Sequence, residues 1–162
     1  MKKTLFLAFV LLLSFKISAQ TEKASIVQYA PSVYIELFGP SALYAVNFDQ
    51  RIAARRDGLG FRGGIGYINV DDFKMLVVPL GFNYLIGKEN RYLELGLGAT
   101  FMDASRGYLF FEPEDNFAGT LYFGFRRQPE DGGINFRFGV SPLFSGRNFF
   151  PFWGGIGFGY SW

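Results

Sequence analysis

Charged residues placed inside otherwise apolar, alternating segments are the first candidates for chemistry in this chain. Three are acids and three are bases: Glu36, Asp49, Glu94, Arg62, Arg126 and Arg137. Two interpretations are open, a charge-lined polar pathway and a fixed network of ion pairs and hydrogen bonds. Buried charges are tolerated only when they are paired, and the acids and bases are equal in number. We therefore favour the network, and we expect Glu94 and Arg62 to be central to it.

The chain contains no histidine and no cysteine, so the commonest catalytic and metal-ligating groups are missing. A Ser-His pair, a thiolate metal site and a disulfide cannot form. Residues 58–63 match G-x-G-x-x-G, but a charged turn precedes them, whereas a dinucleotide site follows a strand. Loop carboxylates such as Asp71 and Asp72 lack the spacing of a calcium loop. We predict no catalytic residue, no cofactor and no metal site.

Residues 1–19 have the layout of a secretory signal peptide. Lys2 and Lys3 precede a continuous apolar run over residues 5–13, and Ala19 offers a small residue before Gln20. The apolar run is shorter than the ~20 residues of a membrane-spanning helix. We expect cleavage after residue 19, which leaves residues 20–162 as one domain.

Removal of the signal changes the charge of the chain. The full sequence has 16 Lys and Arg against 14 Asp and Glu, and three of the lysines lie in the signal. The mature chain keeps 13 bases and 14 acids, for a net charge of −1. Bulk charge therefore gives no support to nucleic-acid binding.

After the signal, bulky apolar residues alternate with small or polar ones at a period of two, between turn signals. One face of each alternating segment carries Phe, Leu, Ile, Val and Tyr, and the other is mostly glycine, with 21 Gly and 21 Phe in the chain. The pattern predicts eight strands, over residues 32–38, 43–51, 59–67, 74–85, 92–101, 119–126, 134–142 and 152–162.

The type of residue on the second face separates two all-β folds. A soluble sheet covers its wet face with Lys, Glu, Thr and Gln, whereas this face has little side-chain volume. A narrow barrel has a crowded inner wall and a roomy outer one, and its outer face meets lipid. The sequence therefore predicts an eight-stranded antiparallel transmembrane β-barrel with a lumen filled by side chains. A soluble secreted β-sandwich is the rival fold.

Connection lengths suit a barrel whose N-terminus lies in the periplasm. The short, charged turns 52–58, 87–90 and 127–133 would lie on that side. The outer connections would be residues 39–42, 68–73, 102–118 and 143–151, with the longest, 102–118, facing outward as is typical.

Two aromatic clusters belong to the outer connections. Tyr108, Leu109, Phe110 and Phe111 form a candidate interaction patch in the longest loop, and a second cluster spans residues 149–153. An aromatic girdle at headgroup level is the other interpretation of both.

The C-terminus and a central segment resemble known proteins. A terminal Trp162, an aromatic Tyr160 two residues earlier and Gly157 five residues before the end are similar to the signal read by the barrel-assembly machinery, although Gly155 stands where that pattern has a polar residue. Residues 78–87 followed by 92–96 resemble outer-membrane β-barrel proteins of Bacteroidetes. The resemblance covers residues 33–162, and the size is similar to that of eight-stranded OmpA-like barrels.

This resemblance implies a porin-like membrane protein in the outer membrane of a Gram-negative cell. Its partners would be outer-membrane lipids, lipopolysaccharide and the assembly machinery, with an unidentified extracellular or periplasmic protein as a further candidate. It implies no activity. We expect a structural or interaction platform that presents extracellular loops, with a narrow pore for small solutes as the alternative. A lipid-modifying enzyme is less expected because histidine is absent.

Overall fold

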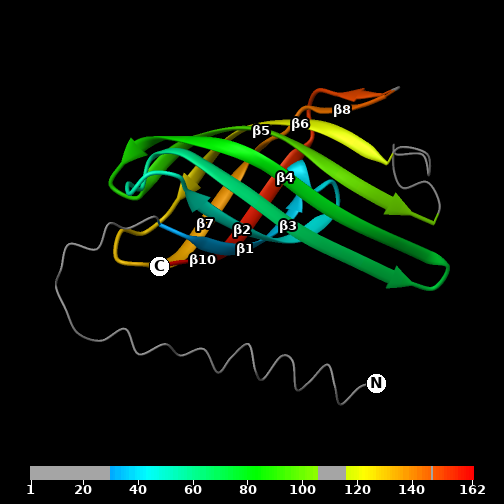
Figure 1. Cartoon of the computed structure of the whole chain (residues 1–162), viewed down its shortest axis with the longest axis horizontal. Coiled ribbons are helices and arrows are strands. Elements are labelled where there is room, and N and C mark those ends of the chain that lie inside the picture. The colour runs from blue at the N-terminus through cyan, green and yellow to red at the C-terminus, as the bar shows by residue number, and fades with distance from the viewer. Residues whose placement is uncertain (1–29, 106–115, 147) are drawn as a thin grey trace, which may run out of the picture.

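The computed structural model describes residues 30–105, 116–146 and 148–162, which form one antiparallel sheet closed on itself (Figure 1). Pairing of β1 with β10 and of β5 with β6 completes the ring. The elements in chain order are β1 (Ser32–Phe38), the 3₁₀ helix η1 (Gly39–Ser41), β2 (Tyr44–Arg51), β3 (Gly58–Val70), β4 (Phe73–Lys88), β5 (Arg91–Ala104), β6 (Phe117–Arg127), β7 (Gly133–Val140), β8 (Leu143–Ser145), β9 (Phe149–Phe150) and β10 (Gly154–Ser161).

Eight barrel strands result because two of them are interrupted. β7 and β8 pair with β6 in one register, with Val140 opposite Phe123 and Ser145 opposite Ala118. The break falls at Pro142, which has no N–H to donate to a ladder. β9 and β10 are likewise two pieces of the last strand, separated by a one-residue shift in register. The predicted all-β, eight-stranded antiparallel barrel is confirmed, and the rival sandwich is wrong as a fold.

The strands extend further than the sequence predicts at the end that was expected to face outward. The expected outer connection 68–73 is a tight turn at Asp71 and Asp72, because β3 and β4 continue to pair up to Val70 and Phe73. The expected loop 143–151 contains the β8–β9 hairpin instead. These additional residues lie beyond the part of the sequence where apolar and polar residues alternate clearly. They form strands because a neighbouring strand continues beside them. The alternation within one segment does not reveal such a neighbour.

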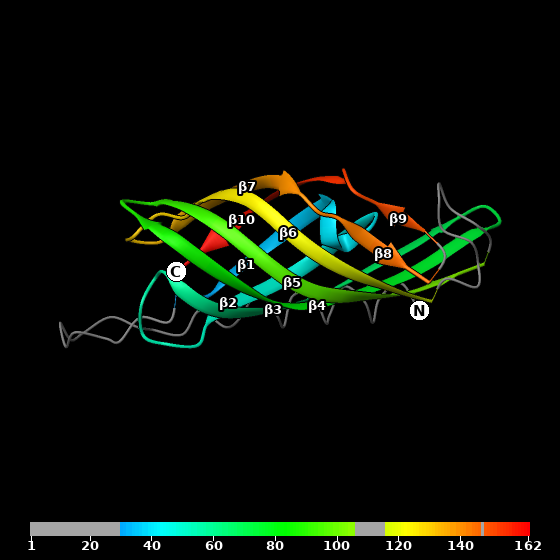
Figure 2. The same cartoon turned by 90° about the horizontal axis from the view of Figure 1, so that it is seen from above.

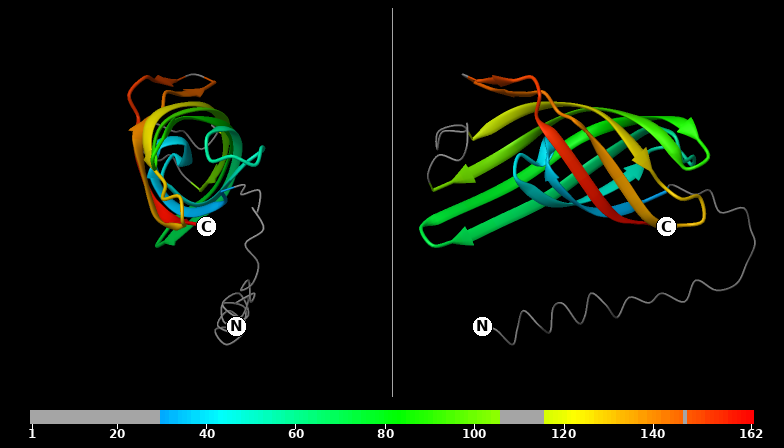
Figure 3. Two further views of the ribbon diagram at one scale, coloured as in Figure 1. Left: turned by 90° about the vertical axis from the view of Figure 1, so that its left-hand side faces the viewer. Right: turned by 180° about the vertical axis from the view of Figure 1, so that it is seen from behind.

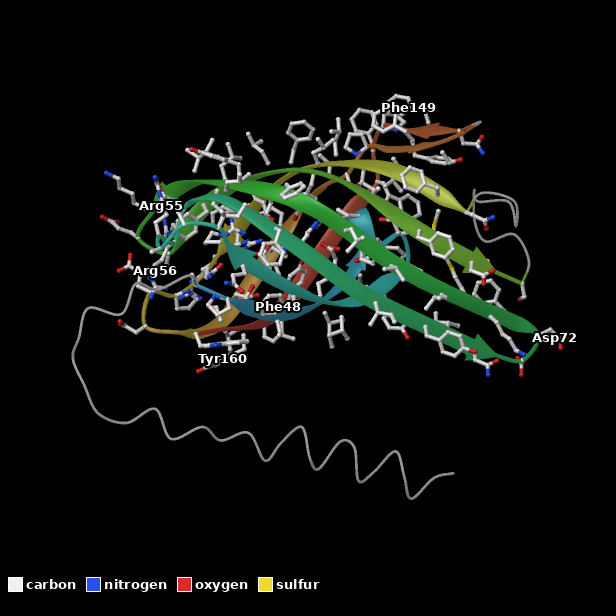
Figure 4. All side chains as sticks on the ribbon, in the orientation of Figure 1. Phe48, Arg55, Arg56, Asp72, Phe149 and Tyr160 are labelled. Atoms are coloured by element: carbon white, nitrogen blue, oxygen red, sulfur yellow. The ribbon has the colours of Figure 1, made fainter. Side chains whose placement is uncertain are left out.

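Side chains alternate across the barrel wall as predicted. Ile35 and Leu93 on the outer face are 53% and 52% exposed, whereas Glu36 and Glu94 beside them are at most 1% exposed. Figure 4 shows Phe48 and Tyr160 pointing away from the ribbon. The outer face is therefore an apolar belt, and the buried charged side chains of the strands lie on the inner face.

The two ends of the barrel differ. The turns 52–57, 89–90 and 128–132 lie at the same end as Ala30 and Trp162 (Figures 1 and 2). The β3–β4 turn and the β8–β9 hairpin lie at the other end, where β3 to β6 rise beyond the shorter β1 and β2. Seen along the barrel, η1 folds into the ring of strands (Figure 3). No helix within the described ranges is long and apolar enough to cross a membrane.

Candidate functional site

Arg126 lies at the centre of the charged residues inside the barrel. Its Nη2 is 2.9 Å from Asp49 Oδ2 and 2.7 Å from Glu94 Oε1. Its Nη1 and Nε donate to the second oxygen of each carboxylate, at 3.0 Å in both cases. Both carboxylates are fully buried. Arg126 therefore holds two carboxylates by paired, charge-assisted hydrogen bonds, a geometry that a guanidinium is suited to form.

Arg137 and Arg62 extend this cluster. Arg137 forms an ion pair with Glu94, and its guanidinium carbon lies 4.3 Å from the ring centroid of Tyr34 and 5.6 Å from that of Tyr122. Arg62 Nη1 lies 3.5 Å from Glu36 Oε1. Contacts between guanidinium groups and tyrosine rings stabilise cations that have left water. The structure thus places all six predicted charged residues in the interior, and each has an oppositely charged partner.

Arg62 and Glu94, the two residues expected at the centre of the network, do not pair with each other. Arg62 pairs with Glu36, while Glu94 pairs with Arg126 and Arg137. The cross-strand row that contains Arg62 reaches β5 at Gly98, four residues from Glu94. That offset corresponds to about 13 Å along a strand. It is set by the register between strands, which one sequence does not reveal.

Two residues of the cluster were not predicted from the sequence. Arg51 is fully buried, and its Nη2 lies 2.5 Å from Asp49 Oδ1. Asn83 lies between the two central acids and donates to Glu94 Oε1 at 3.0 Å. The signal for Arg51 was available, because it follows Asp49 by two residues on the same face. With Arg51, the described interior holds four bases and three acids, so the expected equality of charge does not hold.

Inner glycines make room for these large side chains. A Cβ on Gly157 would lie 2.6 Å from Cγ of Arg137, and one on Gly60 would overlap the Arg51 guanidinium. The volume that appeared to be missing from the inner face is therefore supplied by arginine and tyrosine on neighbouring strands.

A second, apolar layer lies between the charged cluster and the end of the barrel that carries the β3–β4 turn and the β8–β9 hairpin. It is built from buried side chains of β4, β5, β6 and β8 together with the residue after η1: Met75, Val77, Met102, Ala118, Leu143 and Ala42. The sequence pattern does not predict this layer. Its residues fall where β4, β5 and β8 rise above the shorter strands, so their burial depends on the tertiary structure.

The helix η1 connects the two layers. Ser41 Oγ donates to Glu36 Oε2 at 2.5 Å, and Thr100 Oγ1 donates to the carbonyl of Pro40. The flanking Phe38 and Ala42 both have φ of 59°, which is unfavourable for residues other than glycine. The surrounding contacts therefore hold a strained turn inside the barrel, where the sequence analysis expected a short external connection.

The remaining predicted site residues lie elsewhere. Tyr108, Leu109, Phe110 and Phe111 fall outside the described residues. Gly157 is buried within β10, between Glu36 and Arg137 on the adjacent strands. Tyr160 and Trp162 are exposed on the outer face, at 55% and 50%. Their role as an assembly signal stays a prediction.

The second aromatic cluster is partly on the surface. Phe144 and Phe149 of the β8–β9 hairpin stack at 4.8 Å between ring centroids, and Phe152 is 87% exposed. Phe38 packs edge-on against Trp153 at 5.9 Å. Figure 4 shows Phe149 on the β8–β9 hairpin. This hairpin continues the apolar outer face beyond the main ring.

The chemical capacity of the interior is limited by its pairing. Every buried carboxylate in the described ranges lies within an ion pair, and within those ranges no group of three acidic side chains is placed to hold a metal ion. At the end with the short turns, hydrogen bonds from Arg55 lower the pKa of the Asp57 carboxyl. The paired charges of the interior are suited to filling and stiffening the barrel.

Comparison with known proteins identifies the fold class. No protein-family model matches the chain, and no curated protein matches it. Among solved structures, the N-terminal β-barrel domain of Pseudomonas aeruginosa OprF is similar, with a TM-score of 0.64 and 10% identity over 83% of this chain and 98% of that domain. The chain therefore has the fold of an eight-stranded outer-membrane barrel domain. At this identity the likeness concerns the fold alone.

Proposed function

We propose that this protein is an integral outer-membrane barrel of a Gram-negative bacterium, with a closed lumen and a structural or interaction role. The observation that carries the proposal is the reversal of polarity across the wall. Large apolar side chains cover the outer face around the barrel, and charged side chains fill the inner face. A continuous apolar exterior of this extent is unfavourable in water and suits the hydrocarbon of a membrane.

The two filled layers support the absence of a continuous channel. Four arginines and three acids fill one part of the interior, and the apolar cluster with η1 fills the part next to it. An ion crossing the barrel would have to displace paired charges and then enter an apolar zone, both of which are unfavourable. Interiors of eight-stranded barrels are normally filled by side chains.

The outer end supports presentation of loops to a partner. β3 to β6 rise above the rest of the ring, and the connection that contains residues 106–115 joins two of these tall strands. The β8–β9 hairpin adds exposed aromatic side chains at the same end. The strands take up both ends of the expected connection 102–118, since β5 runs to Ala104 and β6 begins at Phe117. The connection between these two residues would be the main contact with an extracellular partner or lipopolysaccharide. A Bacteroidetes-type family, assembly by the barrel machinery and a non-enzymatic role belong to the same proposal.

The test combines membrane fractionation with conductance. The protein is recovered from outer membranes, run on a gel with and without boiling, and inserted into planar bilayers. We expect a heat-modifiable band and no discrete conductance steps. Regular conductance steps would instead support the narrow pore. Recovery in the soluble fraction without a mobility shift would contradict the membrane location itself.

A further inference from the structure

An elongated groove crosses the apolar outer face of the barrel. It has a volume of about 760 Å³ and extends over β5, β6, β7, β10 and β1. One wall is a row of outward side chains paired across these five strands: Leu93, Phe125, Phe138, Ile156 and Leu37. The groove therefore follows the hydrogen-bonding direction of the sheet across five strands.

The floor of the groove is backbone. Gly124, Gly139 and Gly155 are paired with one another in the row beside that wall. Gly154 occupies an outward position, and a Cβ added there would have no atom within 4 Å. Four strand spacings give the groove a length of about 19 Å. With the usual tilt of barrel strands, it covers about 12 Å along the membrane normal, most of the ~15 Å of one leaflet.

Three cations lie side by side next to the end of the groove that contains Leu93 and Phe125. Lys88 is opposite Arg91, and Arg91 is opposite Arg127, at the end of the barrel that carries the short turns (Figure 1). All three are exposed, and none forms an ion pair with a described residue. Asp57 lies near enough to Lys88 for their charges to interact, so the charges of Arg91 and Arg127 carry the argument.

The position of these cations points to an anion. Like charges directly opposite one another destabilise a strand pair, so the Arg91–Arg127 pair is unfavourable unless a negative group lies over it. Arg91 and Arg127 are each two residues from the groove residues Leu93 and Phe125 on the same face, a separation of about 7 Å. A guanidinium binds phosphate by paired hydrogen bonds.

We propose that the groove and the row of cations bind one anionic phospholipid of the periplasmic leaflet. An acyl chain lies along the groove, and the phosphate lies over Arg91 and Arg127. The proposal rests on the proposed function, since it requires a membrane barrel whose short turns face the periplasm. An irregular peptide does not fit, because the apolar groove offers no partner for its amide groups within lipid.

The test uses two lipids that differ only in the headgroup. The full barrel in detergent is mixed with equal amounts of dioleoylphosphatidylglycerol and dioleoylphosphatidylcholine, and retained lipid is measured by native mass spectrometry. We expect one retained lipid, with a preference of about tenfold for the anionic one. Arg91→Gln with Arg127→Gln should reduce that preference to about one. The matched control, Arg55→Gln with Arg56→Gln, removes the same charge at the same end and should leave it unchanged.

A second pair of variants tests the groove. Gly154→Leu fills open space in the groove and should lower retention of both lipids severalfold. Gly119→Leu is the control, because it is an outward glycine away from the groove where an added Cβ makes ordinary contact with Phe144 at 3.8 Å. Unchanged retention in Gly154→Leu, no headgroup preference, or several retained lipids without selectivity would each overturn the proposal. A heat-modifiable band for every variant separates such a result from failure of the membrane barrel itself.

Discussion

At the scale of single residues, the stability of the interior depends on carboxylates that pair with more than one arginine. Asp49 and Glu94 each accept from more than one arginine, and Arg126 joins them. Breaking a buried ion pair by removing one partner leaves an uncompensated charge, which is much more costly than losing an exposed pair. The energetic weight of the cluster should therefore lie on the residues that share partners.

A double-mutant cycle tests this distribution. Glu94→Gln should lower the free energy of unfolding by about 3 kcal/mol, since Arg126 and Arg137 lose a shared acceptor. Glu94→Gln combined with Arg126→Gln should show a coupling energy of at least about 1 kcal/mol. The readout is urea unfolding of the barrel in lipid vesicles.

The control cycle combines Glu94→Gln with Arg62→Gln. These two residues share no direct contact, so their effects should add to within about 0.5 kcal/mol. Strong coupling in this second cycle, or additivity in the first, would contradict the pairing seen in the structure.

The hydroxyl of Thr100 gives a second prediction at this scale. Thr100→Val removes the hydrogen bond to the carbonyl of Pro40 and should destabilise the barrel by about 1 kcal/mol. Thr120→Val is the matched control, because that hydroxyl is also buried but donates to no described residue. It should be neutral or slightly stabilising in the same urea titration. Equal losses in the two variants would show that the η1 contact contributes nothing specific.

At the scale of elements, close approach between strands explains the glycines of β10. A Cβ on Gly159 would lie 2.0 Å from the carbonyl oxygen of Val33 and 2.4 Å from Cα of Tyr34. Both atoms belong to the backbone of β1 and cannot move aside without disturbing the strand pair that closes the barrel. Gly154, in the same strand, has open space around it.

Two alanine substitutions in β10 make use of this difference. Gly159→Ala should destabilise the barrel by about 1–3 kcal/mol, as overpacking generally does. Gly154→Ala should change stability by less than about 0.5 kcal/mol. The fraction of heat-modifiable protein after refolding measures both. A tolerated Gly159→Ala would show that β1 and β10 are less closely packed than the structure has them.

At the scale of the whole molecule, the two ends of the barrel carry different surfaces. The end with the short turns exposes the cation row and the Arg55–Asp57 pair, while the outer end exposes Asp71, Asp72 and aromatic side chains (Figure 4). This asymmetry suits a single orientation in the membrane, with the short turns in the periplasm. Ala30 lies at the end with the short turns, which faces the periplasm in the proposed orientation.

Export of the mature chain provides the fourth prediction. N-terminal sequencing of the protein recovered from outer membranes should begin at Gln20, because the first 19 residues have the layout of a cleaved signal. Replacing Leu11 by Arg interrupts the apolar run and should cause unprocessed protein to accumulate. A mature protein that still begins at Met1 would contradict the expected cleavage.

The sequence by itself determined the fold class, the number of barrel strands and the face of each strand. Period-two alternation follows directly from strand geometry, and an inner face of glycine with scattered charges is compatible with few closed sheets. For the same reason, each of the six charged residues could be assigned to the interior from its own strand alone.

Only the tertiary structure decided which side chains meet. Register and the offset between strands placed Glu94 beside Arg126 and Arg137 instead of Arg62, and brought Arg51 into the cluster. The inward fold of η1, the apolar layer above the charges and the groove on the outer face each combine residues from several strands. Such contacts depend on how strands are shifted past one another in a closed barrel, and alternation within a strand carries no information about that shift.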